Sequence, residues 1–548
     1  MKPYNMCADM DEYLGLLDNS ANEVHKRIVA DIPDLASDTG GALTLLWARL
    51  KALKVPSDTL RDLRKNVKVM TARQTNATRP VQANLTTFAT HESGNVDAWL
   101  AAYPERFAWN DALGWLAWSG THWLQGGAGE AMVRRSMEQT LLQRTADLVG
   151  TNKLADVMPT AARVRGMLAL AAPRLYTEAS VFTDASNKHL LNTASGVVNL
   201  RDDVPQRPAV PTDYFMWCVP TPYDPEETEE DLVWRAMVLD WNEDRAEMAE
   251  YVQRSAGYSI TGESSEKCVF FVEGVKGNNG KTTMIRAIKD CLNSRIIHGI
   301  GLDVFTEASR KADPQGFGLI PLIYARFVPA SEGDMNDALK GSVIKVLTSH
   351  GDPLQVAEKG KQAIEWQPTV KIWAMSNHPP KINSGDPRAL ERFRVIPFNR
   401  IYEGDKCDKG LQDRLAMLPQ RQVTLRWLVQ GARAWYAQGV GMPQVVAAAN
   451  HKMEMANNTA ALFVESCLKR SDKALLTSEE LHRFYINWCH QEGVSEDDRK
   501  LSPQLGKALS AAGYIKHNNR KWYATIATND EACELTADIE ADLTAWLN

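Results

Sequence analysis

The sequence lacks paired cysteines, long apolar runs and an excess of basic residues. Its eight cysteines are scattered and never form a C-x-x-C pair, so neither a zinc module nor a disulfide framework is indicated. No run of about 18 apolar residues could cross a membrane, and no basic-then-apolar signal sequence opens the chain. We therefore expect a cytoplasmic protein with reduced cysteines.

An excess of either charge is absent as well. The formal net charge of -6 over 548 residues argues against a uniformly basic coat that binds nucleic acid, but it leaves room for local basic loops. At about 100–200 residues per domain, a chain of this length predicts about three or four domains, each able to bury a core.

Residues 269–283 are the most informative stretch. A β-branched and aromatic run ends at a glycine-rich turn, and Gly280-Lys281-Thr282 then opens a segment with helical spacing. This pattern is typical of a phosphate-binding loop, in which backbone N–H groups and the helix N-terminus bind a polyphosphate. The lysine reaches the terminal phosphates, and the threonine hydroxyl holds Mg²⁺. The predicted nucleotide-binding residues are Gly277, Asn279, Gly280, Lys281, Thr282 and Thr283.

One glycine departs from the strict G-x-x-x-x-G-K-[ST] spacing. That spacing places its first glycine at Val275, whereas Gly274 lies one residue earlier. A glycine-rich turn with an incidental Gly-Lys-Thr is therefore the alternative interpretation. The strand before the turn and the helix after it favour a nucleotide site, so ATP and Mg²⁺ are the expected cofactors.

Polar residues follow two later apolar stretches. Residues 319–330 predict a strand that leads to Glu332, and residues 370–375 predict one that leads to Asn377. A carboxylate there can hold Mg²⁺ or polarise the attacking water, and an amide can contact the γ-phosphate. Arg392 precedes a further strand at 395–398 and, in a ring, could act on the nucleotide of the next subunit. Solvated surface charge is the alternative for Glu332 and Arg392.

Two further stretches carry basic residues. Extended runs around Lys359-Gly360-Lys361 predict a hairpin with a basic tip, for which a solvated turn is the simpler interpretation. Residues 478–526 predict a helix, a second helix and a two-stranded wing. A winged helix of this kind binds duplex DNA or protein, and both uses stay open. Its candidate DNA contacts are Lys516, Arg520 and Lys521.

The order of these features resembles superfamily 3 helicases, in particular the helicase part of phage and plasmid primase-helicases of the poxvirus type. The resemblance extends over about residues 105–525. The stretches that carry it are 257–262, 279–282, 330–332, 347–353, 376–380 and 392–398, together with the tryptophan-rich segment 107–123 and residues 195–200.

The resemblance implies a fold and a set of residue roles. The expected fold is an α/β AAA+-like phosphate-loop ATPase core with a mainly helical N-terminal region and a C-terminal winged helix. Lys281 and Thr282 would bind phosphates and Mg²⁺. Glu332 would be the catalytic carboxylate next to the metal, and Asn377 would sense the γ-phosphate. Arg392 would be a finger that acts on the adjacent protomer.

The resemblance also implies a DNA channel and an order of domains. The hairpin around residues 359–361 would project into a central channel, so that Lys359 and Lys361 grip the DNA backbone without reading bases. The expected domains are a helical N-terminal region (1–85), a domain that precedes the ATPase (86–230), the ATPase and helicase domain (231–400), a helical lid (401–468), a winged helix (469–528) and an acidic tail (529–548).

Together these features predict a homohexameric, ATP-dependent DNA helicase for the replication of a phage, prophage or plasmid in the cytoplasm of a bacterial host cell. Its expected partners are single-stranded or forked DNA and a separate primase or polymerase. An ATP-gated replication initiator, which forms a ring without processive unwinding, is the alternative. A full primase-helicase is disfavoured because no set of primase carboxylates precedes residue 105.

Overall fold

The computed structural model describes residues 47, 51, 61, 64, 84–183, 187–274, 277–305, 317–331, 339, 341–357, 361–377, 387–404, 407–492, 494, 496, 499–517 and 521–526. These residues belong to two compact units, which are described separately. The first holds the described residues up to 377 and from 392 to 446, and the second holds those of 387–391 and from 447 onward. The predicted acidic tail and, apart from isolated residues, the predicted N-terminal helical region lie outside the described part.

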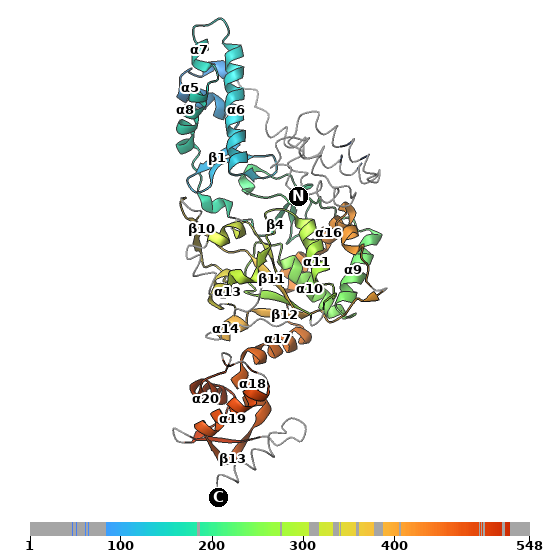
Figure 1. Ribbon diagram of the computed structural model, residues 1–548. Coiled ribbons are helices and arrows are strands. Elements are labelled where there is room, and N and C mark those ends of the chain that lie inside the picture. Colours follow the sequence, from blue (N-terminus) through green and yellow to red (C-terminus); the bar gives the residue numbers. More distant parts are fainter. Residues whose placement is uncertain are drawn as a thin grey trace. The chain divides into compact units, whose positions relative to one another are not determined.

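A helical layer forms the N-terminal part of the first unit, with α5, α6 and α8 side by side (Figure 1). They pack around buried apolar side chains that include Trp99, Met137 and Met167. Arg144 on α6 is also buried, and its guanidinium donates a hydrogen bond to the carbonyl oxygen of Leu85 (2.8 Å). The helices are η2 (Leu85–Thr87), α5 (Glu92–Ala102), α6 (Gly127–Asp147), α7 (Leu154–Val157), α8 (Ala161–Ala171), η3 (Ala172–Arg174), η4 (Ala179–Phe182) and η5 (Pro211–Asp213).

The tryptophan-rich segment forms a small antiparallel sheet in the order β1-β2-β3. Trp118 and Trp123 are each 4% exposed, and their rings meet edge to face with centroids 5.8 Å apart, so these aromatics pack in the core. A separate antiparallel hairpin, β4-β5, turns at Ala194 and Ser195. The strands are β1 (Phe107–Asn110), β2 (Gly114–Trp118), β3 (Trp123–Leu124), β4 (Leu190–Thr193) and β5 (Gly196–Asn199).

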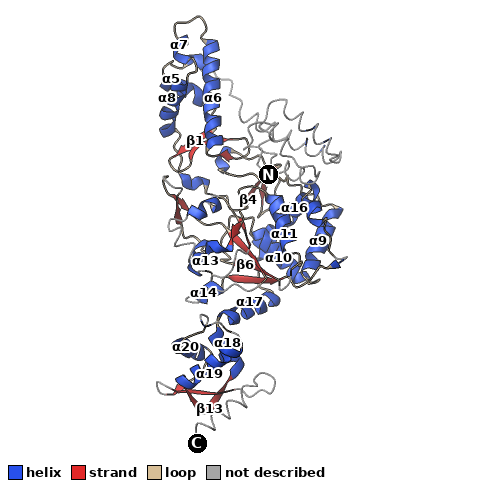
Figure 2. Cartoon of the chain, in the orientation of Figure 1, coloured by secondary structure: helices blue, strands red, loops and turns tan. Residues whose placement is uncertain are grey.

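A parallel sheet with helices around it forms the centre of the first unit (Figure 2). Its strand order is β12-β6-β11-β8-β7, and neighbouring strands pair in parallel. The strands are buried apolar runs, as expected for a sheet covered on both faces. The α/β core predicted from the sequence is therefore confirmed. The strands are β6 (Val269–Glu273), β7 (Ile300–Gly301), β8 (Phe327–Ser331), β11 (Lys371–Ser376) and β12 (Phe393–Pro397).

The strand predicted at residues 319–330 is wrong in its first half. Residues Phe317–Leu322 form the 3-10 helix η7, and the strand β8 begins only at Phe327. Pro321 lies inside η7 and has no N–H group to donate to a neighbouring strand. An apolar run by itself does not distinguish a strand from a short buried helix.

Helices α10 and α16 cross at two glycines. A Cβ atom on Gly257 would lie 2.0 Å from the backbone nitrogen of Ala432, and one on Gly431 would lie 2.2 Å from the carbonyl oxygen of Gln253. The absence of both side chains lets the two backbones approach closely. Helix α16 also packs against α11. The helices of this part are α9 (Glu229–Trp241), α10 (Ala246–Tyr258), α11 (Lys281–Leu292), η6 (Leu302–Phe305), η7 (Phe317–Leu322), α13 (Gly341–Leu347), α15 (Leu411–Leu415) and α16 (Leu418–Gln438).

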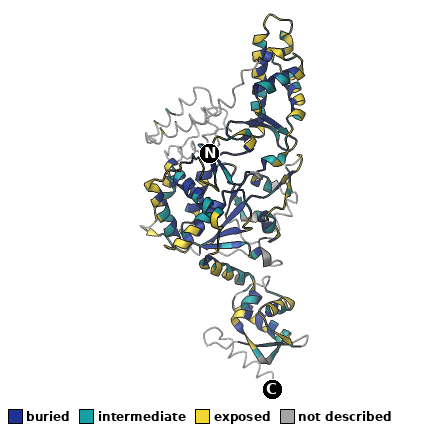
Figure 3. Ribbon diagram, turned by 180° about the vertical axis from the view of Figure 1, so that it is seen from behind, coloured by how far each residue is buried: buried dark blue, intermediate teal, exposed yellow. Residues whose placement is uncertain are grey.

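A buried arginine ties the N-terminal part of this unit to the parallel sheet. Arg326, directly before β8, donates hydrogen bonds to the carbonyl oxygens of Leu190 (2.8 Å) and Ile260 (2.9 Å). Its guanidinium also lies 5.0 Å from the centre of the Trp217 ring. A buried guanidinium that lost these acceptors would raise the free energy of the folded state. The hydrogen bonds therefore hold the N-terminal part and the parallel sheet together. Figure 3 shows how far buried residues (dark blue) run through the central strands.

The second unit consists of helices and a small antiparallel sheet in the order β13-β15-β14. Its core includes Tyr485, Trp488, Leu505 and Trp522. The helices predicted at 478–489 and 505–513 are present as α19 and α20. The elements are α14 (Pro387–Leu390), α17 (Gln444–Asn457, which begins in the first unit), α18 (Thr459–Cys467), β13 (Leu468–Thr477), α19 (Ser478–Gln491), α20 (Ser502–Ala511), β14 (Lys516–His517) and β15 (Lys521–Ile526).

Candidate functional site

The loop between β6 and α11, which we call the β6–α11 loop, explains the shifted glycine. A Cβ atom on Gly274 would lie 1.7 Å from the side-chain nitrogen of Asn279 and 2.9 Å from Nζ of Lys281. Gly274 is therefore needed where it stands, because both side chains fold back over it. Among the described residues, a Cβ atom on Gly277 would meet nothing within 4 Å, so their packing does not require glycine there.

Two structural features require glycine at position 280, where α11 begins. Its φ of +85° is the left-handed conformation that favours glycine. A Cβ atom at this position would also lie 2.7 Å from the indole ring of Trp241, the last residue of α9. The ring of Trp241 thus supports the loop and leaves space for no other residue type at Gly280.

The ammonium of Lys281 lies at the carboxyl edge of two neighbouring strands. Lys281 is 7% exposed. Its Nζ donates to the carbonyl oxygens of Gly274 (3.1 Å) and Ser376 (3.1 Å) and to Oδ1 of Asn377 (2.8 Å). β6 and β11 are parallel neighbours with Glu273 opposite Ser376, so both chains leave the sheet at the same edge. The structure therefore brings together two residues that lie 96 positions apart in the sequence.

The residues around this ammonium fit a polyphosphate with its Mg²⁺. The first turn of α11 holds no acidic residue, and its exposed Thr282 lies beside the buried Lys281. Backbone N–H groups at the start of a helix attract anions. Phosphate oxygens could replace the three acceptors that Lys281 now contacts. Thr282 is the residue of this turn that would hold the metal, and Glu332, the other predicted metal residue, lies outside the described residues.

A cluster of polar residues that contacts the β6–α11 loop was not predicted from the sequence. The backbone N–H of Tyr402 donates to the carbonyl oxygen of Asn278 (2.9 Å), and its hydroxyl donates to Oδ2 of Asp240 (2.6 Å). Arg400 forms ion pairs with Asp240 and Asp244. Burial, followed by the hydrogen bond to Asp240, raises the pKa of Tyr402. No motif marks these residues, because Arg400 and Tyr402 lie about 120 positions beyond the loop and Asp240 and Asp244 about 30 positions before it.

Arg392 lies at the opposite edge of the sheet from the β6–α11 loop. It directly precedes β12, whose first residue pairs with Val269 at the start of β6. At about 3.3 Å per residue, the length of β6 separates it from the loop of its own chain. Its Nη1 donates to Thr348 Oγ1 (2.7 Å) and to the carbonyl oxygen of Lys345 (3.2 Å). The structure thus places this arginine at the end of β6 that lies opposite the β6–α11 loop of its own chain.

The hairpin predicted around Lys359 to Lys361 is present. β9 (Leu354–Val356) and β10 (Ile364–Trp366) pair in antiparallel fashion, with Val356 opposite Ile364. Lys361 is exposed, and Lys359 lies outside the described residues. Both strands of the hairpin hold buried side chains, because Val356 is 2% and Trp366 is 0% exposed.

The predicted C-terminal cations are exposed where the structure describes them. Lys516 lies on β14 and Lys521 on β15, and Arg520 lies outside the described residues. Nζ of Lys516 lies 5.3 Å from the centre of the Trp522 ring. The arrangement leaves both charged groups in contact with solvent.

The described residues include neither a helix that could span a membrane nor a cluster of metal-binding side chains. In this part of the chain, no helix is both long and apolar enough to cross a membrane. Among the same described residues, no group of three or more histidine, cysteine, aspartate or glutamate side chains is placed to hold a metal ion.

Three family models match successive parts of the chain. Residues 96–243 match "D5 N terminal like", and residues 456–541 match "Poxvirus D5 protein-like". Between them, residues 272–392 match a family of unknown function, DUF5906. This middle match includes the β6–α11 loop, Asn377 and Arg392.

Two curated viral proteins are similar to this chain. "Putative helicase L207/L206" of Acanthamoeba polyphaga mimivirus is 24% identical over 214 residues, which is 39% of this chain and 22% of that protein. "Putative helicase 022R" of Frog virus 3 (isolate Goorha) is 21% identical over 281 residues, 47% of this chain and 28% of that protein. The matches thus span about a quarter of the length of these relatives.

Solved structures of the C-terminal region of NrS-1 are also similar, with 10% and 11% identity and TM-scores of 0.41 and 0.43. Each comparison covers 77% of this chain and 96% of the NrS-1 chain. The D5 matches on either side of the middle segment, together with the similarity to the two viral proteins, support a relationship of this chain to the poxvirus D5-type primase-helicase family with a superfamily 3 helicase.

Proposed function

We propose that this protein is a Mg²⁺- and ATP-dependent DNA helicase that works as a homohexameric ring in the replication of a phage, prophage or plasmid. The observation that carries the proposal is the contact of Lys281 with Asn377 at the carboxyl edge of β6 and β11. Ligands of open α/β sheets bind outside this edge. The relationship to the D5-type family supports the same reaction class.

In this proposal the nucleotide phosphates lie on the β6–α11 loop. Asn279, Gly280 and Thr283 would contribute backbone N–H groups, and Gly277 would let the backbone pass close to the phosphates. Lys281 would move from its three present acceptors to the terminal phosphates. Bound Mg²⁺ would neutralise charge on the phosphate oxygens.

The hydrolytic residues would come from the same edge of the sheet. Glu332 directly follows β8, next to β11, and would hold the attacking water as its base. Asn377 would exchange its contact with Lys281 for one with the γ-phosphate or that water. Asn377 directly follows β11. Its contact with the γ-phosphate would therefore couple the presence of that phosphate to the position of the strand.

The position of Arg392 supports a shared active site. Its own nucleotide would lie beyond the far end of β6, so an arginine at this edge can serve only the nucleotide of another subunit. We propose that Arg392 stabilises transition-state charge in trans. Its hydrogen bonds to Lys345 on α13 and to Thr348 directly after that helix would hold it in place until the subunits meet.

DNA would contact the hairpin first. Lys361 is exposed beside the hairpin tip, and Lys359 adds a second positive charge in the sequence. Cations at such a tip attract the phosphate backbone without selecting bases. Lys516, Arg520 and Lys521 would give the C-terminal unit a separate contact with duplex DNA.

The experiment is ATP hydrolysis with and without single-stranded DNA. We expect DNA to stimulate hydrolysis in the wild type and Lys281→Ala to abolish it. Lys289→Ala removes an exposed lysine from the same helix and is the matched control. Combined substitution of Lys359 and Lys361 by alanine should remove the stimulation only. If DNA-stimulated hydrolysis drives no strand separation on any fork, the chain is an initiator ring.

A further inference from the structure

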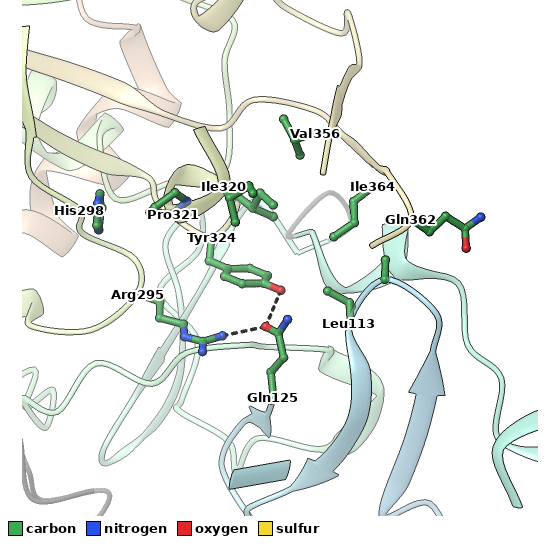
Figure 4. A pocket seen from close by; sticks show the side chains of 12 residues that line it. Leu113, Gln125, Arg295, His298, Ile320, Pro321, Tyr324, Val356, Gln362 and Ile364 are labelled. Carbon is green, nitrogen blue, oxygen red and sulfur yellow. Dashed lines mark hydrogen bonds between the residues drawn. The ribbon is translucent and has the colours of Figure 1, made fainter. Parts of the chain in front are cut away.

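A pocket of about 280 Å³ lies between the hairpin and the N-terminal part of the first unit (Figure 4). We call it the hairpin pocket. The turn between β1 and β2 forms one wall through Leu113, and the hairpin forms another through Val356 and Ile364. Residues after α11 and in and after η7 complete it, among them Arg295 and Tyr324. The pocket thus joins several segments that are separate in the sequence.

Three polar groups meet at one side of the pocket. Oε1 of Gln125 accepts hydrogen bonds from Arg295 Nη1 (3.2 Å) and from the hydroxyl of Tyr324 (3.0 Å). Figure 4 shows Gln125 between these two partners. The guanidinium carbon of Arg295 also lies 5.3 Å from the centre of the Tyr324 ring. An aromatic ring, a carboxamide and a cation therefore face one small volume.

The remaining wall consists of buried, well-packed apolar side chains. Leu113 is 3%, Ile323 3%, Val356 2% and Ile364 8% exposed, so their side chains are fixed by packing. Arg295 itself is exposed, and its guanidinium has further N–H donors for an anion. This combination suits a planar aromatic group that has a hydrogen-bonding edge and a phosphate attached to it. A nucleotide unit has all three properties.

The charge of the pocket also suits a nucleotide. His298 lines the pocket, and burial, followed by the nearby charge of Lys289, lowers the pKa of its imidazole. It is therefore neutral near pH 7 and can donate one hydrogen bond and accept another. Arg295 then supplies the positive charge for the phosphate, and the imidazole edge is available to a base.

We propose that the hairpin pocket binds one unstacked nucleobase of the DNA strand that the hairpin contacts, with Arg295 on its phosphate and Gln125 and Tyr324 on its edge. This rests on the proposed function, because the hairpin must meet DNA. The volume of about 280 Å³ leaves room for one base. A base held there is clamped between the hairpin and the N-terminal part, so a step of the hairpin would release it.

The test uses the full chain and an oligonucleotide that contains 2-aminopurine, whose fluorescence rises when the base leaves the stack. Fluorescence and affinity are read without ATP. We expect a rise with wild type, and loss of the rise with an affinity at least about fivefold weaker in Arg295→Ala. Tyr324→Phe removes only the hydroxyl and should reduce the rise. Arg165→Ala, which removes an exposed arginine from α8, is the matched control and should behave as wild type.

Two outcomes would overturn the proposal. One is an unchanged fluorescence rise and affinity in folded protein that carries both Arg295→Ala and Tyr324→Phe. The other is saturable binding of free dAMP that Arg295→Ala abolishes while oligonucleotide binding stays intact, which would assign the pocket to free nucleotides. Because no ATP is present, the readout is separate from the proposed helicase activity. A wild type without DNA-stimulated hydrolysis would contradict the helicase and leave the pocket test standing.

Discussion

The ammonium of Lys281 donates a hydrogen bond to the side-chain oxygen of Asn377 across 2.8 Å. Lys281 directly follows the β6–α11 loop, and Asn377 directly follows strand β11. The two residues meet because β6 and β11 are parallel neighbours. A phosphate that draws Lys281 away must also change the surroundings of Asn377. Under the proposed function, nucleotide binding at the loop would thereby be linked to the end of β11.

The first prediction concerns Asn377. Asn377→Ala should lower the rate of ATP hydrolysis about 100-fold, because a polar group that acts on the transition state is lost. Nucleotide affinity should change only a few-fold, since Lys281 and the loop remain. Steady-state hydrolysis and the binding of a fluorescent ATP analogue measure the two effects. Asn152→Ala, at an exposed site, is the control, and equal loss of affinity and rate would contradict the assigned role.

The second prediction concerns Gly274. Gly274→Ala places a methyl group 1.7 Å from the Asn279 side chain and 2.9 Å from Lys281 Nζ. We expect loss of nucleotide binding and a decrease of about 1–3 kcal/mol in the free energy of unfolding. Gly277→Ala has open space and should not lower that free energy. Denaturant titration of both variants decides the point, and equal stability of the two would show that the loop tolerates the methyl group.

The third prediction concerns pH and His122. Burial, with the charge of Arg295 as a second cause, lowers the pKa of His122 to about 4. Nδ1 of this imidazole lies 2.9 Å from the Thr121 hydroxyl and 3.3 Å from that of Ser119. The unfolded chain takes up a proton near pH 6.5, whereas the folded chain does so only near pH 4. Stability should therefore fall as the pH drops through this window, by up to about 3 kcal/mol.

The comparison of His122→Gln with wild type measures this effect. The free energy of unfolding of the variant should depend less on pH between about 6.5 and 4, because glutamine takes up no proton. His451→Gln, at an exposed site of the second unit, should leave the dependence unchanged. The same slope in His122→Gln and wild type would show that His122 is not the titrating group.

The fourth prediction concerns subunits that complement each other. Lys281→Ala and Arg392→Ala should each be inactive in ATP hydrolysis when pure. Mixed, they form interfaces with an intact Lys281 on one side and an intact Arg392 on the other. Hydrolysis should then recover to a fraction of the wild-type rate. No recovery in mixed assemblies of verified stoichiometry would mean that Arg392 acts within its own chain or not at all.

The order of the strands and of the polar residues that follow them could be predicted, because short-range patterns in the sequence indicate it. The apolar runs, the Gly-Lys-Thr turn and the position of Asn377 after β11 each follow from short-range pattern. The strand at 319–330 was wrong in its first half, because Pro321 and its neighbours form η7. Trp241 and Tyr402 could not be predicted, since their function comes only from contacts with the β6–α11 loop.

The hairpin, too, could be predicted from the sequence only in part. Its two strands follow from alternation around a turn, and both are present. That Val356 and Ile364 of the hairpin form a pocket with Gln125 and Leu113 depends on how the N-terminal part packs on the sheet. Arg326 helps to fix that packing through carbonyl oxygens of distant segments, and no sequence period records such contacts.

Strand displacement on a forked DNA duplex tests the central claim most directly. With ATP and Mg²⁺, the wild type should separate the strands in a time course that Lys281→Ala abolishes and that Lys289→Ala leaves unchanged. A nonhydrolysable ATP analogue should support DNA binding without separation. Separation that proceeds equally well in Lys281→Ala, or no separation by a wild type that hydrolyses ATP on the same fork, would contradict the assignment of this chain as an ATP-driven DNA helicase.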